Sequence, residues 1–323
     1  MKLSVWLVFS CAIAVAPSVF ADFYVTSRDG GFGDLYRYTN GGAFIAKYPG
    51  NGLNNGQGVV IGPNGNLLVV NESGSVLQYN PATGAFISVF ATVSGPGAIT
   101  VGPDNNVYVG SAGIVVKLNG TTGASMGTFA SGGMLSVAGV AFGPNGNLFV
   151  TDGLGNTVKQ FNGTSGAFVN NFATSPGLNS GAGPLIFYNG NLLVAQAFLG
   201  SGFGDSILKF DQTTGASLGN FASDSNLNGP DGLIAGPDGN LYVANYNADN
   251  VLKYSPTGTF LGVFANVSLN GAAAPTFIAY SSASRPVPGT PAPSTLVLLL
   301  LGMTMVGAWP QIRRLARARA TRR

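Results

Sequence analysis

The sequence predicts an all-β fold built from repeated four-stranded sheets, and three observations support that prediction. A turn followed by an apolar run, typified by Gly-Pro-Asn-Gly-Asn-Leu-Phe-Val, returns five times. A second turn and a Phe-Ala pair recur between its copies. Glycine is abundant (49 residues) and only 8% of residues are charged, while aromatic and β-branched residues are plentiful. This composition is typical of strands joined by tight turns and not of a disordered chain.

The first repeated motif predicts a hairpin turn that leads into a buried strand. Its copies begin at Gly62, Gly102, Gly143, Phe187 and Gly236, at spacings of 40, 41, 44 and 49 residues. Proline sets φ for the second turn position, and glycine accepts the positive φ that closes a tight turn. The apolar run that follows has no polar face, so we expect burial on both sides. The regular spacing indicates a repeat architecture.

The second repeated turn joins the third and fourth strands of each unit. In the unit around Gly143, four strands are predicted over residues 139–142, 148–152, 157–161 and 168–172. The fourth strand usually ends in Phe-Ala, and we expect these rings to wedge between neighbouring sheets. Copies of the second turn are Asn80–Phe86, Asn119–Ser125, Asn162–Phe168 and Asp211–Ser217, with looser copies at Ser255–Phe260 and Asn40–Phe44.

The two ends of the repeat region predict a closed ring. Six second strands can be counted, and the first, Phe23–Val25, has no inner strand before it. A spare strand, Thr276–Tyr280, follows the last unit and matches the other inner strands. We predict that it completes the N-terminal blade of a six-bladed β-propeller over residues 22–280, which removes the exposed sheet edge. A right-handed β-solenoid is the alternative, but it offers no role for the spare strand. The repeat resembles the NHL-type propellers, a fold also seen in streptogramin lyases and gluconolactonase-like proteins.

Residues 1–21 predict a secretory signal peptide. Lys2 precedes an apolar run from Leu3 to Ala16, and small residues precede a cleavage point after Ala21. An N-terminal membrane anchor is the alternative, although the apolar run is short for a span. The only cysteine, Cys11, lies in this segment, so we expect no disulfide in the mature protein.

The C-terminal segment predicts a sorting signal. A Ser/Pro/Gly linker over residues 281–294 precedes an apolar helix at 295–312, and an Arg-rich cytoplasmic tail at 313–323 follows. The segment resembles the PEP-CTERM signal of exosortase-processed bacterial proteins, with Pro291, Ala292, Pro293 and Ser294 as the sorting motif. The resemblance implies an exosortase-type processing enzyme as a partner and export through the inner membrane of a Gram-negative bacterium to the envelope, cell surface or extracellular matrix.

One departure from that family leaves the processing open. Ala292 stands where the family has glutamate, so both cleavage and a permanent membrane anchor through residues 295–312 remain open. A plain C-terminal transmembrane anchor is the alternative interpretation of the whole segment.

The charge distribution argues against nucleic acid as a partner. Six of the nine arginines lie in the last eleven residues, and residues 22–293 hold five lysines and three arginines against twelve acids, a balance of −4. No basic face is therefore available to neutralise phosphates. The chain also has no histidine, which removes the commonest general base and excludes a Ser-His-Asp triad. The chemistry of a streptogramin lyase depends on a histidine, so the resemblance does not carry that activity over.

Candidate site residues come from the loops that share one face of a propeller. These loops follow the second strands or precede the inner strands, and their best candidates for a ligand or metal are Glu72, Asp152, Asp231 and Asn245. In gluconolactonase-like propellers such residues coordinate Ca²⁺ through hard oxygens, and the resemblance implies a calcium site here. The alternative is that Asp and Asn cap their own loops through backbone hydrogen bonds. Asp104 and Asp238 replace asparagine in the hairpin turns and are interpreted as turn formers.

The function predicted from these features is a non-enzymatic binding or scaffolding module outside the cell. Extracellular polysaccharide or a surface protein is the expected partner, by resemblance to other proteins with this sorting signal. Tyr246, Phe198 and Phe203 on the loop face are suited to stacking on sugar rings, or they pack under their own loops. A Ca²⁺-dependent lactonase or related hydrolase is the alternative function.

Overall fold

The computed structural model describes residues 22–29, 32–174, 178, 182–197, 205–268, 271 and 273–281. The predicted signal peptide, sorting motif, apolar helix and Arg-rich tail lie outside these residues, as do Phe198 and Phe203. The helix η1 (Tyr246–Ala248) is a 3₁₀ helix of three residues. No helix in this part of the chain is long and apolar enough to cross a membrane.

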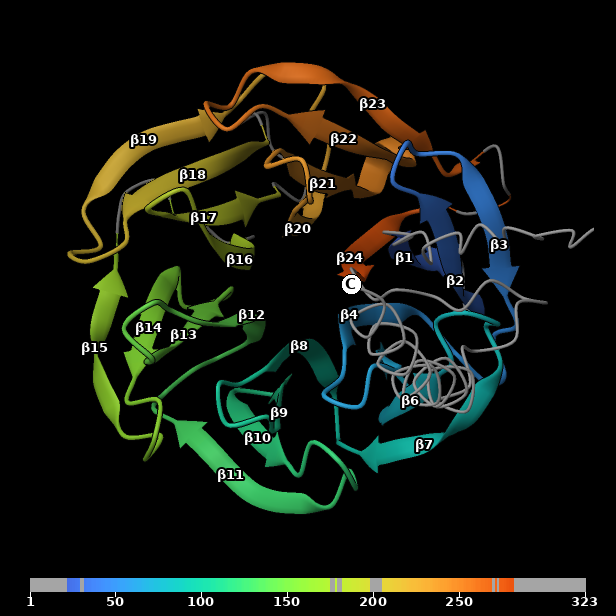
Figure 1. The fold of residues 1–323 in the computed structure, drawn as a ribbon. Helices are drawn as coiled ribbons and strands as arrows, with labels where there is room; N and C mark the ends of the chain where they lie inside the picture. The colour runs from blue at the N-terminus through green and yellow to red at the C-terminus, as the bar shows by residue number, and fades with distance from the viewer. Residues whose placement is uncertain are drawn as a thin grey trace, which may run out of the picture. The chain divides into compact units, whose positions relative to one another are not determined.

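The described residues form six four-stranded antiparallel sheets arranged around an axis, as Figure 1 shows. Each sheet is one blade, and the six-bladed propeller predicted from the sequence is confirmed. Blade 1 holds β24 (Pro275–Ser281), β1 (Asp22–Asp29), β2 (Phe32–Thr39) and β3 (Phe44–Tyr48); blade 2 holds β4 (Gly56–Ile61), β5 (Leu67–Asn71), β6 (Ser75–Tyr79) and β7 (Phe86–Thr92); blade 3 holds β8 (Pro96–Val101), β9 (Val107–Ser111), β10 (Ile114–Leu118) and β11 (Ser125–Ser131). Blade 4 holds β12 (Val137–Phe142), β13 (Leu148–Asp152), β14 (Thr157–Phe161) and β15 (Phe168–Ala173); blade 5 holds β16 (Ala182–Tyr188), β17 (Asn191–Gln196), β18 (Ser206–Asp211) and β19 (Ser217–Ala222); blade 6 holds β20 (Pro230–Ala235), β21 (Leu241–Asn245), β22 (Asn250–Tyr254) and β23 (Phe260–Asn266).

The ring closes through β24, as the sequence predicts. In Figure 1 the red strand β24 lies beside the dark blue strand β1, and their register pairs Phe23 with Tyr280 and Val25 with Ile278. Two buried threonines reinforce the junction. The Thr26 and Thr276 hydroxyl oxygens are 2.9 Å apart, and Thr276 also donates to the carbonyl of Gly56 in the neighbouring blade at 2.7 Å. The threonine pair therefore links the two chain segments that form blade 1 and also connects blade 1 to blade 2.

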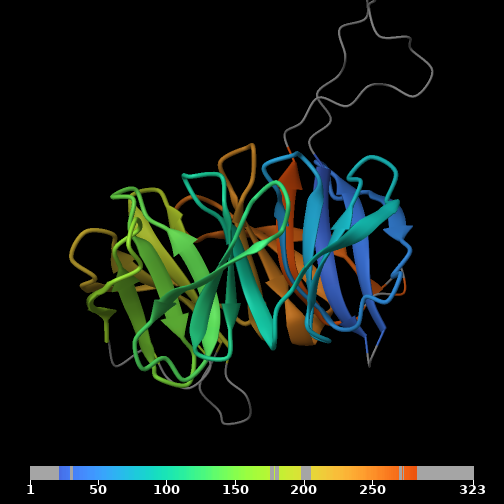
Figure 2. The same cartoon turned by 90° about the horizontal axis from the view of Figure 1, so that it is seen from below.

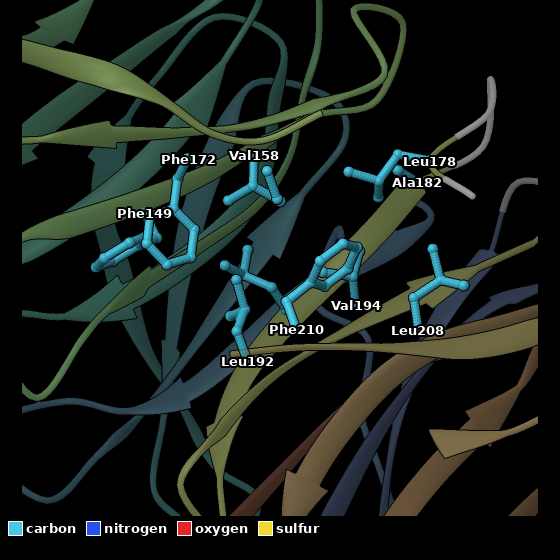
Figure 3. Packing of buried hydrophobic residues seen from close by; sticks show 11 residues of the cluster. Phe149, Val158, Phe172, Leu178, Ala182, Leu192, Val194, Leu208 and Phe210 are labelled. Atoms are coloured by element: carbon cyan, nitrogen blue, oxygen red, sulfur yellow. The ribbon is translucent and has the colours of Figure 1, made fainter. Parts of the chain in front are cut away.

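The hydrophobic core is divided among the six interfaces between neighbouring blades. Each of six buried clusters draws its residues mainly from two adjacent blades, as Figure 3 shows for blades 4 and 5. There Phe149 and Phe172 meet edge to face, with ring centroids 4.8 Å apart. Strands β5, β9, β13 and β21 are buried at every position, because each is flanked by strands of its own blade and covered by blades on both faces. The predicted aromatic wedges are confirmed at this interface.

The recurring glycine of the second turn is required by close packing between blades. A Cβ atom at Gly123 would lie 1.8 Å from the Phe90 carbonyl oxygen, and one at Gly166 would lie 1.7 Å from that of Phe129. Both glycines also have positive φ. The Thr-Gly turn of one blade therefore packs directly against the Phe-Ala end of the preceding blade, which explains why the two motifs recur together.

Candidate functional site

The two sets of loops named in the sequence analysis meet at one face of the propeller and line a cavity there. The cavity has a volume of about 440 Å³ and lies at one end of the central channel. Figure 2 shows the strands running between the two faces, so that the loops gather at their ends. We call this cavity the channel mouth. It is lined by Arg28, Ser136, Ala138, Gly153, Leu154, Ala182, Gly183, Ala197, Gly229, Asp231, Tyr246 and Asn247.

The last residue of the second strand holds the loop that precedes the inner strand. Asp152 is buried, and its Oδ1 accepts hydrogen bonds from the backbone N–H groups of Leu135 (3.0 Å), Ser136 (3.0 Å) and Gly155 (3.1 Å). Lys159 approaches the other carboxylate oxygen at 3.9 Å. Three donors on one oxygen commit this side chain to the loop.

Equivalent positions in other blades repeat this arrangement. Asn245 is fully buried, accepts from the N–H of Asn228 at 2.6 Å and donates to the carbonyl of Asn226 at 2.9 Å. Asn71 accepts from the N–H of Asn54 at 2.9 Å, and the hydroxyl of Ser111 donates to the carbonyl of Ser94. In each of blades 2, 3, 4 and 6, a hydrogen bond joins this side chain to the backbone of the residue 17 positions earlier in the sequence. We call Asn71, Ser111, Asp152 and Asn245 the loop clamps.

Asp231 occupies a different repeated position, the second residue of the inner strand at the channel mouth. The equivalent residues are Gln57, Gly97, Ala138, Gly183 and Thr276, none of them charged. Among the described residues, none donates a hydrogen bond to the Asp231 carboxylate. Burial raises the pKa of this carboxyl to about 7, although the nearby Arg28 guanidinium favours the ionised form. The side chain nevertheless reaches water through the mouth, since it lines the cavity.

Arg28 brings Glu72 to the edge of the same cavity. Its Nη2 donates to both carboxylate oxygens of Glu72, at 3.1 and 3.3 Å, and the Asn55 amide donates to Glu72 at 2.7 Å. Both charged side chains are partly exposed, at 34% for Arg28 and 45% for Glu72. Glu72 and Asp231 are therefore the two predicted site residues that the structure brings together, through Arg28. Sequence reasoning missed Arg28, which lies near the end of β1 and whose only signal was its place shortly after the predicted strand Phe23–Val25.

The channel mouth is asymmetric in its chemistry. Tyr246 and Asn247, in η1, are fixed by backbone hydrogen bonds to Gly229 (2.8 Å) and Asn228 (3.0 Å). They lie on the same side as Asp231 and Arg28, so the polar groups come from blades 6 and 1. The wall from blades 4 and 5 is made largely of small residues, and Leu154, 64% exposed, stands at its rim. The opposite wall therefore leaves room for a ligand that the polar side can hold.

The four predicted residues do not form a compact set of metal ligands. In the described part of the chain, no group of three or more Asp, Glu, His or Cys residues is arranged to hold a metal ion. Asp152 and Asn245 direct their oxygens to loop N–H groups, as the loop-capping alternative expected. Asp231 and Arg28 both line the mouth, and Arg28 binds Glu72.

The turn-forming acids Asp104 and Asp238 have a second role. Asp104 accepts from Lys117 (2.8 Å) and from the Tyr108 hydroxyl (3.0 Å) in addition to its own turn. Asp238 accepts from Lys253 (2.7 Å) and Tyr242 (3.0 Å) in the same way. Burial opposes ionisation, but these hydrogen bonds outweigh it and hold the pKa of both carboxyls below the usual range. The acid, tyrosine and lysine form a structural unit on two blades.

A second cavity, of about 390 Å³, lies further along the channel. It is lined by all six inner strands and mostly by aliphatic side chains such as Ile61, Val101 and Ile186. Among the described residues, no charged side chain lines it. The charged groups of the channel are therefore confined to the mouth.

Comparisons with known proteins show the fold alone. No protein-family model matches the chain, and no curated protein matches it. A protein of unknown function from Bacteroides caccae is similar in structure, with a TM-score of 0.62 at 15% identity over 81% of this chain and 98% of that one. A chain of the nidogen/laminin complex gives a TM-score of 0.64 at 12% identity over 82% and 100%. Catalytically inactive virginiamycin B lyase from Staphylococcus aureus, with quinupristin, gives 0.51 at 14% over 66% and 71%.

These similarities define the class of the protein as a six-bladed β-propeller. The similar structures include an enzyme and a member of a protein complex. The fold alone therefore does not indicate which activity a propeller has. Function must therefore be inferred from the residues of the channel mouth.

Proposed function

We propose that the chain is an exported binding module, associated with the cell surface or its matrix, that holds an extracellular polysaccharide at the channel mouth without catalysing a reaction. The observation that carries the proposal is the asymmetry of that mouth. In a repeat protein, residues shared by the blades maintain the fold, whereas Arg28, Asp231 and Tyr246 depart from the repeat and converge on one cavity. An aromatic ring, an amide and charged hydrogen-bonding groups beside a small-residue wall suit a hydroxyl-rich ligand.

The terminal segments support the cellular part of the proposal. A signal peptide at 1–21 and a PEP-CTERM-like segment at 281–323 would route the chain through the inner membrane of a Gram-negative bacterium to an exosortase-type enzyme. The intact mass of the protein from native cells tests this directly. Loss of residues 1–21 and of the apolar segment at 295–312 is the expected result. An unprocessed C-terminus would identify a permanent anchor instead.

The binding role is tested by retention on extracellular polysaccharide purified from the cells that make the protein. The purified full chain is compared with a variant carrying Arg28→Ala, Asp231→Ala and Tyr246→Ala. Asp211→Asn is the matched control, because asparagine already occupies that turn position at Asn80 and Asn119. The expected result is loss of retention in the triple variant only. Equal retention of all three proteins would reject the mouth as the binding site. If the chain binds a surface protein and no polysaccharide, that protein is the partner instead.

A calcium-dependent lactonase is separated from this proposal by a melting experiment. A calcium site that joins Asp152 to Asp231 would raise the melting temperature in millimolar Ca²⁺, and Asp152→Ala would abolish that rise. The binding proposal expects no Ca²⁺-dependent shift, because Asp152 is committed to three backbone donors.

A further inference from the structure

We infer that the channel mouth recognises a neutral sugar ring through two adjacent hydroxyl groups that donate hydrogen bonds to Asp231. This inference rests on the proposed function and names its ligand class. Three features of the mouth lead to it: a carboxylate that accepts no hydrogen bond from a described residue, an arginine that is already bound to Glu72, and a wall of small residues that leaves room for one ring.

The first feature is the unmet hydrogen-bonding capacity of Asp231. A carboxylate offers about four acceptor sites. No described residue donates to this one, although the acids elsewhere on the same face are well supplied. The neighbouring positions cannot help, because Ala138 and Gly183 have no donor on their side chains. A ligand that brings two O–H donors would satisfy the carboxylate in a partly desolvated site, where such bonds are strongest.

The second feature is the balance of charge around the carboxylate. Arg28 faces Asp231 from β1, but both oxygens of Glu72 already hold its guanidinium at 3.1 and 3.3 Å. The remaining neighbours are Tyr246, Asn247 and the Gly229 N–H, which donates to Asp205. A sugar acid would place its carboxylate beside Asp231, where the nearest guanidinium is already bound to Glu72. A neutral ring avoids this like-charge repulsion.

The third feature is the shape of the mouth. Its volume of about 440 Å³ lies in the lower part of the range for small-molecule pockets, which is about 300–1,000 Å³. Small residues from blades 4 and 5 clear the space opposite Asp231, while Tyr246 and the exposed Leu154 offer apolar surfaces at the rim. A pyranose has an apolar face for such surfaces and hydroxyls at its edge for the polar wall.

Calorimetric titration of the full chain with matched sugars tests the inference. The probes are the methyl glycosides of glucose, galactose and mannose, with methyl glucuronide as the charged counterpart. At least one neutral glycoside is expected to bind at least tenfold more tightly than the glucuronide. Hydroxyl donors favour the ionised carboxylate, so binding at pH 7 should release protons, which repeating the titration in buffers of different ionisation enthalpy measures.

Two variants assign the effect. Asp231→Asn should weaken binding at least tenfold and abolish the proton release, whereas Asp211→Asn should change neither. Tighter binding of the glucuronide, no binding of any neutral glycoside, or proton release by the Asp231→Asn variant equal to that of the native chain would overturn the inference. These failures differ from failure of the proposed function, which would appear as polysaccharide retention that ignores the mouth variants altogether.

Discussion

Asp152 and Asp231 are both acidic residues on the loop face of the propeller, yet their surroundings are opposite. Asp152 ends a second strand and accepts three backbone hydrogen bonds on one oxygen. Asp231 begins an inner strand, accepts none from a described residue and lines the channel mouth. The equivalents of Asp152 are polar: Asn71 and Asn245 also accept from a loop N–H, and Ser111 donates to a loop carbonyl, whereas no equivalent of Asp231 is charged. In this repeat protein, the polar residues that follow the repeat maintain a loop, and we propose that Asp231, which departs from it, serves a ligand.

The largest expected effect is at a loop clamp. Asn245→Ala removes an acceptor and two donated bonds in a fully buried site and leaves the Asn228 N–H without its partner. We expect a loss of about 3 kcal/mol in the free energy of unfolding, because buried groups without partners bear their full desolvation cost. Urea denaturation measures it. A loss below about 0.5 kcal/mol would mean that the clamps do not hold the loops.

The pH dependence of stability distinguishes Asp231 from the clamps. Its folded-state pKa, about 7, lies above the value of 3.8 for an unperturbed carboxyl. Folding is therefore favoured while the group is protonated, and this contribution declines as pH rises from about 4 through about 7. We expect Asp231→Asn to be more stable than the native chain by about 2 kcal/mol at pH 8, about half of what the full pKa shift gives because the carboxyl reaches water through the mouth, and equal to it near pH 4. Parallel pH profiles for the two proteins would contradict this account.

Thr276 shows that the inner-strand position is not free in every blade. Its buried hydroxyl bonds with Thr26 and donates to Gly56 across the blade boundary. Thr276→Val keeps the shape of the side chain but removes both hydrogen bonds, so we expect a loss of about 1.5 kcal/mol in the free energy of unfolding. Ile278→Val is the control for a change of side-chain size in the same strand. Thermal unfolding of the two variants gives the comparison. Equal melting temperatures for Thr276→Val and the native chain would remove the threonine pair from the closure.

The smallest effect is expected at the surface pair of Lys117 and Asp104. Both side chains are partly exposed, so Lys117→Gln, the residue found at the matching position 78, should cost about 0.5 kcal/mol at neutral pH. The pKa of the Asp104 carboxyl is lowered in the folded state. The stability that the ion pair contributes is therefore complete above the usual carboxyl pKa and declines as the pH falls from there through the lowered folded-state value. Unfolding at pH 7 and at pH 2 checks the sign. A difference that grows on acidification would contradict it.

Much of the fold could be predicted from the sequence because its signals repeat. The spare strand Thr276–Tyr280, the Phe-Ala wedges and the shared loop face all follow from aligning the blades. The same alignment could have separated Asp152 from Asp231, since Asp152 matches Asn71 and Asn245, whereas Asp231 matches Gly97, Ala138 and Gly183. The pairing of acid with tyrosine was also visible: Asp104 and Asp238 precede Tyr108 and Tyr242 by four residues, whereas Asn64 and Asn145 precede Leu68 and Phe149.

The remaining features of the site depend on long-range contacts that no repeat encodes. Arg28 meets Glu72 across 44 residues and faces Asp231 from the far end of the chain, which only ring closure brings together. The raised pKa of Asp231 arises from the combined burial by several blades. Neither could be read from spacing along the sequence.

The most direct test of the central claim is the free energy of unfolding of Asp152→Ala and Asp231→Ala, measured side by side in urea at pH 7. The account predicts that Asp152→Ala loses about 3 kcal/mol, because three backbone donors lose their acceptor, and that Asp231→Ala loses none and is slightly more stable than the native chain. Equal losses in the two variants would show that Asp231 is a structural residue like Asp152, and the assignment of the mouth as a ligand site would then fail.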